Sequence, residues 1–131
     1  MAIAKFCSNL RKFYTIIIND NQLETLKMIF NNCQYLESIK IWRGYGYLDT
    51  NGSTKELFEV LAKYSPKCFH ELHISLPSLF LEKYLEEFFI NWKNRIPLSF
   101  DLDMDCENYE VTEIIEKYKK LGIIKKFELK V

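Results

Sequence analysis

Short runs of alternating hydrophobic and polar residues are separated along this chain by longer stretches with helical spacing. The clearest alternation is Phe100-Asp101-Leu102-Asp103-Met104-Asp105, which predicts a strand with one buried face and one wet face. The longer stretches carry apolar residues three and four positions apart, which predicts amphipathic helices. The pattern therefore indicates an α/β protein in which strands and helices take turns.

The pattern places five strands and four helices. The strands are predicted at about 10–18, 33–41, 69–75, 97–105 and 127–131, and the helices at about 22–32, 53–65, 79–93 and 109–121. Pro66 ends the second helix because proline cannot continue one, and Gly122 stands where a helix C-terminal cap belongs. The inward positions are expected to be Leu23, Leu26, Ile29 and Phe30; Leu57, Phe58, Leu61 and Tyr64; Leu81, Leu85, Phe88, Phe89 and Trp92; Val111, Ile114, Ile115, Tyr118 and Leu121.

One pattern recurs at each predicted strand. Its clearest copy is Cys33-Gln34-Tyr35-Leu36-Glu37-Ser38-Ile39-Lys40-Ile41, and degraded copies begin at residues 7, 66, 94 and 121. The matching hydrophobes Phe13, Ile39, Leu72, Phe100 and Phe127 are 26, 33, 28 and 27 residues apart, near the period of leucine-rich repeats. Repeated strand–helix units bury their apolar sides by stacking on their neighbours. We therefore expect a short right-handed solenoid with about five parallel strands in one sheet and four helices on its convex side. The alternative is an ordinary α/β domain with regular spacing.

The C-x-x-L-x-x-I-x-I pattern of the copy at Cys33 resembles the cysteine-containing, ribonuclease-inhibitor-like leucine-rich repeats that follow the F-box in ubiquitin-ligase subunits. The ending Tyr118-Lys119-Lys120-Leu121-Gly122-Ile123-Ile124-Lys125-Lys126-Phe127 is similar to fungal F-box/leucine-rich-repeat proteins. The resemblance implies a non-catalytic module that recognises the substrate of such a ligase. No F-box helix cluster precedes Cys7, so residues 1–131 are expected to form a single leucine-rich-repeat-like domain from the C-terminal part of a longer architecture. The alternative is a stand-alone structural or inhibitor-like binding protein with no ligase role.

Composition narrows the classes of partner. Eighteen basic and eighteen acidic residues cancel, which argues against a nucleic-acid module and a polybasic membrane patch. Lys5 interrupts the N-terminal sequence after only four residues, so no signal peptide is predicted. No apolar run approaches the ~20 residues of a membrane span. The expected localisation is cytoplasmic or nuclear, with a protein partner and no nucleic acid or membrane.

The cysteines at 7, 33, 68 and 106 contain no C-x-x-C pair, and only two histidines accompany them. No zinc-ligand spacing can be built from this set. Cys7 and Cys33 occupy the same repeat position, which favours small buried hydrophobes with reduced thiols over a disulfide framework. We expect no metal and no cofactor.

Residues between the repeated hydrophobes should point away from the helices, because strand side chains alternate between faces. This alternation predicts a partner-binding row of Tyr14, Lys40, His73, Asp101 and Glu128, with Tyr14 and Trp42 as anchors because aromatic residues dominate interface energetics. The alternative is a solvated face without a partner.

The connection from Trp42 to Asn51 lengthens its repeat, and insertions in repeat proteins often gather on the binding face. It adds Trp42, Arg43, Tyr45 and Tyr47 to the predicted partner-binding residues, since these types are enriched at interfaces. The alternative is that Tyr45, Tyr47 and Leu48 fold back over the next helix.

No catalytic residue is predicted, and the chain is not expected to be an enzyme. His70 and His73 lack the four-residue helical spacing of a metalloprotease and would point to opposite faces of a strand. Asp101, Asp103 and Asp105 share a face that could hold Mg²⁺, but no further ligand cluster accompanies them. Cys68 could contact His70 from the same strand face, yet no oxyanion motif follows.

The first strand contains the run Phe13-Tyr14-Thr15-Ile16-Ile17-Ile18. Solenoids close their ends with polar capping units, and an uncapped hydrophobic edge is a template for pairing. We therefore expect self-association through this strand or marginal solubility of the chain alone.

Overall fold

The structure is a computed structural model that describes residues 9–17, 21–43, 53–77 and 81–131. Within these ranges strands and helices alternate, as the hydrophobic pattern predicts. In chain order the elements are β1 (Lys12–Ile17), α2 (Asn21–Asn32), β2 (Ser38–Arg43), α3 (Ser53–Tyr64), β3 (Glu71–Leu76), α4 (Leu81–Asn91), β4 (Leu98–Met104), α5 (Tyr109–Lys120) and β5 (Ile124–Lys130).

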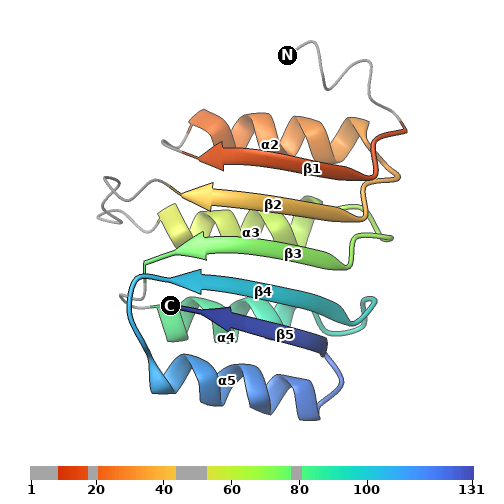
Figure 1. The fold of residues 1–131 in the computed structure, drawn as a ribbon. Helices are drawn as coiled ribbons and strands as arrows, with labels where there is room; N and C mark the ends of the chain where they lie inside the picture. The colour runs from red at the N-terminus through yellow and green to blue at the C-terminus, as the bar shows by residue number, and fades with distance from the viewer. Residues whose placement is uncertain (1–8, 18–20, 44–52, 78–80) are drawn as a thin grey trace.

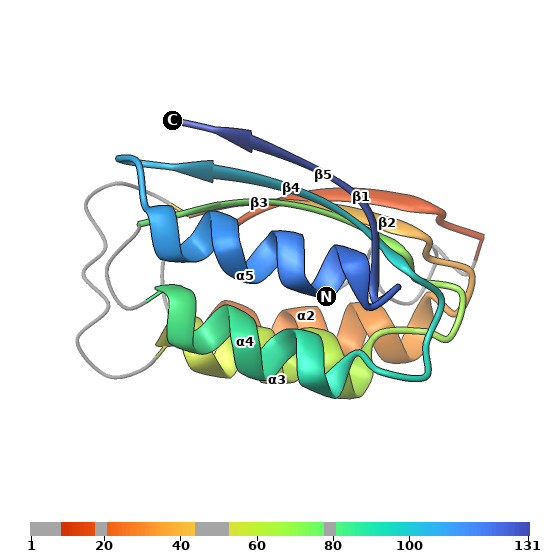
Figure 2. The same cartoon turned by 90° about the horizontal axis from the view of Figure 1, so that it is seen from below.

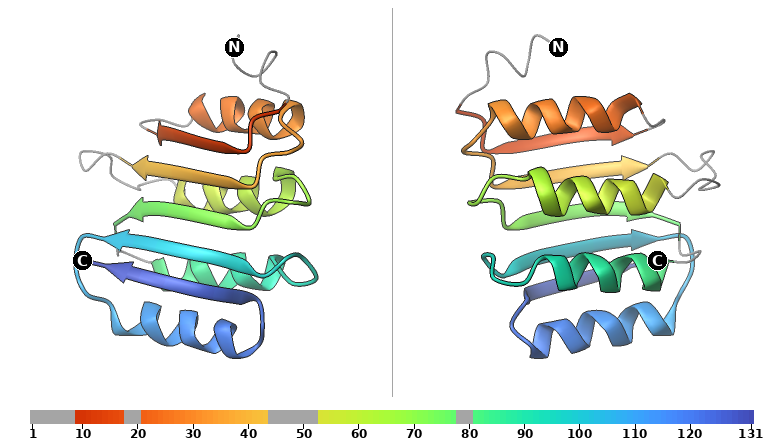
Figure 3. Two further views of the ribbon diagram at one scale, coloured as in Figure 1. Left: turned by 45° about the vertical axis from the view of Figure 1, so that its right-hand side comes forward. Right: turned by 180° about the vertical axis from the view of Figure 1, so that it is seen from behind.

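All five strands belong to one parallel sheet in the order β1-β2-β3-β4-β5 (Figure 1). Each helix crosses between neighbouring strands, and the four helices lie in one layer on the same side of the sheet (Figure 2). The view from behind shows the helices in front of the strands (Figure 3, right), whereas the view of Figure 1 shows the strands in front. The chain is therefore an α/β protein whose described residues form two layers, and none of the described helices covers the other face of the sheet.

The strand register aligns the repeated hydrophobes. Phe13, Ile39, Leu72, Phe100 and Phe127 are successive partners across the sheet. A second line of partners on the same side runs through Thr15, Ile41, Ile74, Leu102 and Leu129. In the three central strands the members of both lines are buried against the helices, so the side of the sheet that each residue takes follows from the alternation.

Aromatic rings link the repeats within the core. Phe69, in the turn before β3, contacts the rings of Phe30 in α2 and Trp92 just after α4. From Trp92 the series of rings continues through Phe88 and Phe89 to β4 and α5, with neighbouring ring centroids 5.4–5.7 Å apart. Aromatic pairs at these separations add to the burial free energy, so the rings help hold successive repeats together.

Several predicted boundaries were wrong by a few residues. β2 begins at Ser38, because Cys33 to Glu37 form the turn that follows α2, and β3 begins at Glu71. β5 begins at Ile124, three residues before the predicted start. Leu121 was expected to face inward but is 63% exposed, because α5 ends at Lys120 and Leu121 is its C-cap.

Candidate interaction surface

The sheet face without helices is called the open face here. It carries three rows of side chains that follow the strand register. The first row is Lys12, Ser38, Glu71, Ser99 and Lys126; the second is Tyr14, Lys40, His73, Asp101 and Glu128; the third is Ile16, Trp42, Ser75, Asp103 and Lys130. The second row is the partner-binding row that the sequence predicts, with every neighbour in the predicted order.

The β1–β2 side of the open face is aromatic and basic. Tyr14 is 55% exposed, and the Lys40 Nζ lies 5.7 Å from the centroid of its ring, within the range of a cation–π contact. Ile16 is 39% exposed, whereas its neighbour Trp42 in the same row is half-buried. This side therefore offers a ring, an ammonium group and apolar surface within two strands.

The centre of the open face is acidic and contains a histidine–aspartate contact. The Nε2 of His73 lies 3.1 Å from the Oδ2 of Asp103 on the neighbouring strand. The other oxygen of Asp103, Oδ1, is buried and has no hydrogen-bond partner among the described residues. Asp101 is half-buried beside it, and Ser75 and Ser99 are buried in the floor of the face.

β5 is the last strand of the open face and carries alternating charges. Lys126, Glu128 and Lys130 are all exposed, and the Nζ of Lys130 lies 3.7 Å from the Oε1 of Glu128. Ion pairs between exposed side chains contribute little to stability, so these groups stay accessible to a partner.

Three of the predicted residues fall at or beyond the end of β2. Arg43 is the last residue of that strand and pairs with Ile17, but its side chain is not described. Tyr45 and Tyr47 lie outside the described residues, as does the prediction that they fold back. Trp42 was predicted both on the strand face and at the start of the loop, and the structure places it within β2.

The sequence allowed a Cys68–His70 contact, but the structure directs both side chains to main-chain oxygens. The Sγ of Cys68 lies 3.4 Å from the carbonyl oxygens of Gln34 and Leu36, and the Nδ1 of His70 lies 2.8 Å from the carbonyl oxygen of Cys68. Both residues precede β3, so they do not share a strand face. The Sγ of Cys68 and the Nδ1 of His70 contact carbonyl oxygens of the turns and are not arranged as a nucleophile and its base.

The aspartates of β4 do not form a metal-binding cluster. Asp101 and Asp103 are half-buried and Asp105, beyond the strand, is exposed. In the part of the chain that the structure describes, no three His, Cys, Asp or Glu side chains are close enough together to hold an ion.

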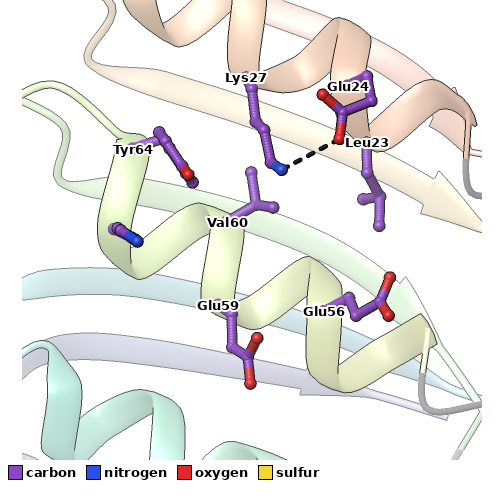
Figure 4. Close-up of a pocket in the computed structure, with 8 residues that line it drawn as sticks. Leu23, Glu24, Lys27, Glu56, Glu59, Val60 and Tyr64 are labelled. Carbon is purple, nitrogen blue, oxygen red and sulfur yellow. Dashed lines mark hydrogen bonds and ion pairs between the residues drawn. The ribbon is translucent and has the colours of Figure 1, made fainter.

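A hollow of about 540 Å³ lies on the helix layer, between α2 and α3 (Figure 4). Leu23 and Val60 form its apolar part, and the Nζ of Lys27 donates to the Oε1 of Glu24 at 3.1 Å. This hydrogen bond raises the pKa of Lys27 because it favours the charged form. A second hollow of about 570 Å³ lies between α5 and the ends of β4 and β5. Neither hollow includes a residue of the predicted site.

Comparisons of this chain with protein-family models, with curated proteins and with solved structures returned no match. The class of this protein is defined by its architecture alone: it is an α/β protein with one parallel sheet and one open face. Among the described residues, no helix combines the length and the apolar character needed to cross a membrane.

Proposed function

We propose that this chain is a non-catalytic protein-binding module of the leucine-rich-repeat solenoid type and that its partner binds the open face. The observation that carries the proposal is the uncovered row of Tyr14, Lys40, His73, Asp101 and Glu128. Arrays of parallel strands in consecutive order, with helices along one side, use the free sheet face to bind partners.

The architecture supports the solenoid part of this proposal. Each of α2, α3 and α4 packs against the helix that follows it, and neighbouring strands pair in chain order. Packed helices are spaced about 8–10 Å apart and paired strands about 4.8 Å, so a longer array of this kind must bend with its helices on the convex side. The right-handed turn follows from the handedness of parallel strand–helix–strand crossovers.

The biological setting comes only from the resemblance of the Cys33 repeat and of the ending at residues 118–127. We propose a cytoplasmic or nuclear protein that serves as the substrate-recognition portion of an F-box-type ubiquitin-ligase subunit. In this role the open face holds the substrate. A stand-alone structural or inhibitor-like binding protein would use the same face without changing the lifetime of its partner.

The test compares two double variants in quantitative affinity capture from the protein's own cells. Tyr14→Ala/Lys40→Ala removes the exposed ring and the ammonium group from the open face. The matched control Tyr35→Ala/Lys67→Ala removes the same residue types from exposed positions in the turns. Truncating interface anchors typically costs 2 kcal/mol or more, so we expect roughly a tenfold or greater loss of the partner from the first variant only.

If both variants capture equal amounts of the partner, the open face is not the binding site. For a captured partner, a chase experiment with and without this chain separates the two settings. A ligase subunit shortens the half-life of the partner, whereas a stand-alone binding protein leaves it unchanged.

A further inference from the structure

Charges on the open face are segregated by strand. Lys12 and Lys40 are the charged side chains of its β1–β2 side, and both are basic. On β3 and β4 the corresponding positions carry Glu71, Asp101 and Asp103, with His73 between them. A partner that lies across the strands therefore meets a basic, aromatic side first and an acidic strip next.

Only part of the acidic strip has a side-chain partner among the described residues. His73 pairs with Asp103, but no hydrogen bond or ion pair from the described part of the chain engages the carboxylate of Glu71 or of Asp101. Glu71 and Asp101 lie on neighbouring strands, one row apart. Like charges at this separation repel, and a cation from a partner relieves that repulsion.

The basic side is preorganised in a different way. Lys40 lies over the ring of Tyr14, which keeps both groups on the same part of the face. Lys12 forms no hydrogen bond or ion pair within the described residues. A carboxylate beside an apolar or aromatic group would complement this side, because the partner then meets both the ammonium groups and the apolar surface.

From these observations we infer that the partner is a protein segment of bipolar charge that lies across the strands. Its Lys or Arg side chains contact Glu71 and Asp101, and its Asp or Glu side chains contact Lys12 and Lys40. The inference rests on the proposed function and specifies the chemistry of the partner. The two sides are centred two strand spacings apart, about 10 Å. An extended chain covers this span in about three residues, so the opposite charges of the segment are expected about three positions apart.

The test selects binders from a phage-displayed library of random linear nonapeptides on the wild-type chain. Enriched peptides are expected to carry a basic and an acidic residue about three positions apart more often than the starting library. Glu71→Gln/Asp101→Asn should lower the affinity for these peptides by roughly two- to fivefold per charge removed, as for exposed ion pairs. The affinity that remains should depend less on salt concentration. The control Glu87→Gln/Glu113→Gln removes the same charge from exposed helix positions and should leave binding unchanged.

The outcomes separate the inference from the function on which it rests. Peptides without the bipolar pattern that still lose binding to Tyr14→Ala/Lys40→Ala would overturn the inference and leave the open face as the binding site. Peptides that bind this variant as tightly as wild type would overturn both, as would a selection that enriches nothing. Circular dichroism of each variant confirms that it is folded before binding is compared.

Discussion

Arg95 ties the turn before β4 to the end of α3. Its Nη1 donates to the carbonyl oxygen of Ala62 at 3.1 Å and to the Oγ of Ser65 at 2.8 Å, and its Nη2 donates to the carbonyl oxygens of Ser65 at 3.3 Å and Pro66 at 2.6 Å. The guanidinium also lies 3.9 Å from the ring centroid of Trp92. The last carbonyls of a helix lack intrahelical partners, so one side chain satisfies groups that belong to the preceding repeat.

Burial lowers the pKa of Arg95 because water is removed from the charged group, and its four acceptors offset that cost. Replacing it by lysine keeps the charge but loses the planar fork that reaches several oxygens at once. We expect Arg95→Lys to lower the free energy of unfolding by about 1–3 kcal/mol, the range for a buried group left without its partner. Urea unfolding measures the loss.

Lys93 provides the matched control, because it is an exposed neighbour in the same turn. Lys93→Ala should change the free energy of unfolding by less than about 0.5 kcal/mol. The same urea midpoint for Arg95→Lys and wild type would show that the four hydrogen bonds contribute nothing.

Sequence reasoning missed Arg95, and the reason is physical. The repeat pattern treats it as a polar residue between hydrophobes, while its acceptors lie about thirty positions earlier in the chain. Cys68 is similar, because its thiol reaches carbonyl oxygens of the preceding repeat. Periodicity assigns a side chain to a face, but it does not indicate which distant carbonyl the side chain will reach.

At the scale of elements, the end of α5 depends on a left-handed residue. Gly122 has φ +83°, its N–H donates to the carbonyl oxygen of Lys119 at 3.1 Å, and the N–H of Ile123 donates to that of Tyr118 at 3.0 Å. These two bonds form a Schellman motif. A side chain at Gly122 would meet no atom within 4 Å, so a substitution there is strained by the backbone conformation alone.

Gly122→Ala is therefore expected to lower the free energy of unfolding by about 1–2 kcal/mol, the cost of a left-handed conformation for an ordinary residue. Asn94, shortly after α4, has φ +71° and provides the matched control. Asn94→Gly keeps that conformation accessible and should change stability by less than about 0.5 kcal/mol. Thermal unfolding of both variants checks the pair, and an unchanged midpoint for Gly122→Ala would contradict the assignment.

The elements and the composition of the open face were predictable because both depend on local periodicity. Alternation placed Phe100, Leu102 and Met104 in the core and Asp101 and Asp103 on the open face. The His73–Asp103 contact was not predictable, because it crosses strands diagonally and joins neighbouring rows. The strand register sets the distance between the two backbone positions, and the rotamers of both side chains decide whether the contact forms.

For the whole molecule, the two margins of the sheet differ in charge and in exposed apolar area. Within the described ranges β1 pairs with β2 alone and β5 with β4 alone. β1 presents the exposed Tyr14 and Ile16 together with one lysine, whereas the exposed open-face residues of β5 are all charged. Charged edge strands resist pairing with other chains and apolar ones favour it, so β1 is the margin at which self-association is expected.

Charge also favours one geometry of self-association. If β1 of a second copy continued the sheet beyond β5, Lys12 would stand beside Lys126, its equivalent in the first row. Antiparallel pairing of two β1 strands about Tyr14 instead places Lys12 beside Ile16 of the other copy. An interface of this isologous kind closes as a dimer, whereas head-to-tail contacts continue into filaments. We therefore expect a concentration-dependent dimer.

Sedimentation velocity over a hundredfold range of concentration tests this expectation with two matched variants. Ile16→Lys adds a charge to the exposed edge of β1, where lysine opposes strand pairing, and should remain a monomer throughout. Ile90→Lys adds the same charge at a position of α4 that is 54% exposed, and it should dimerise as wild type does. A wild-type chain that sediments as a monomer at every concentration would refute pairing through β1. Species that grow beyond the dimer would favour head-to-tail contacts despite the two lysines, because only that geometry leaves a free edge after each addition.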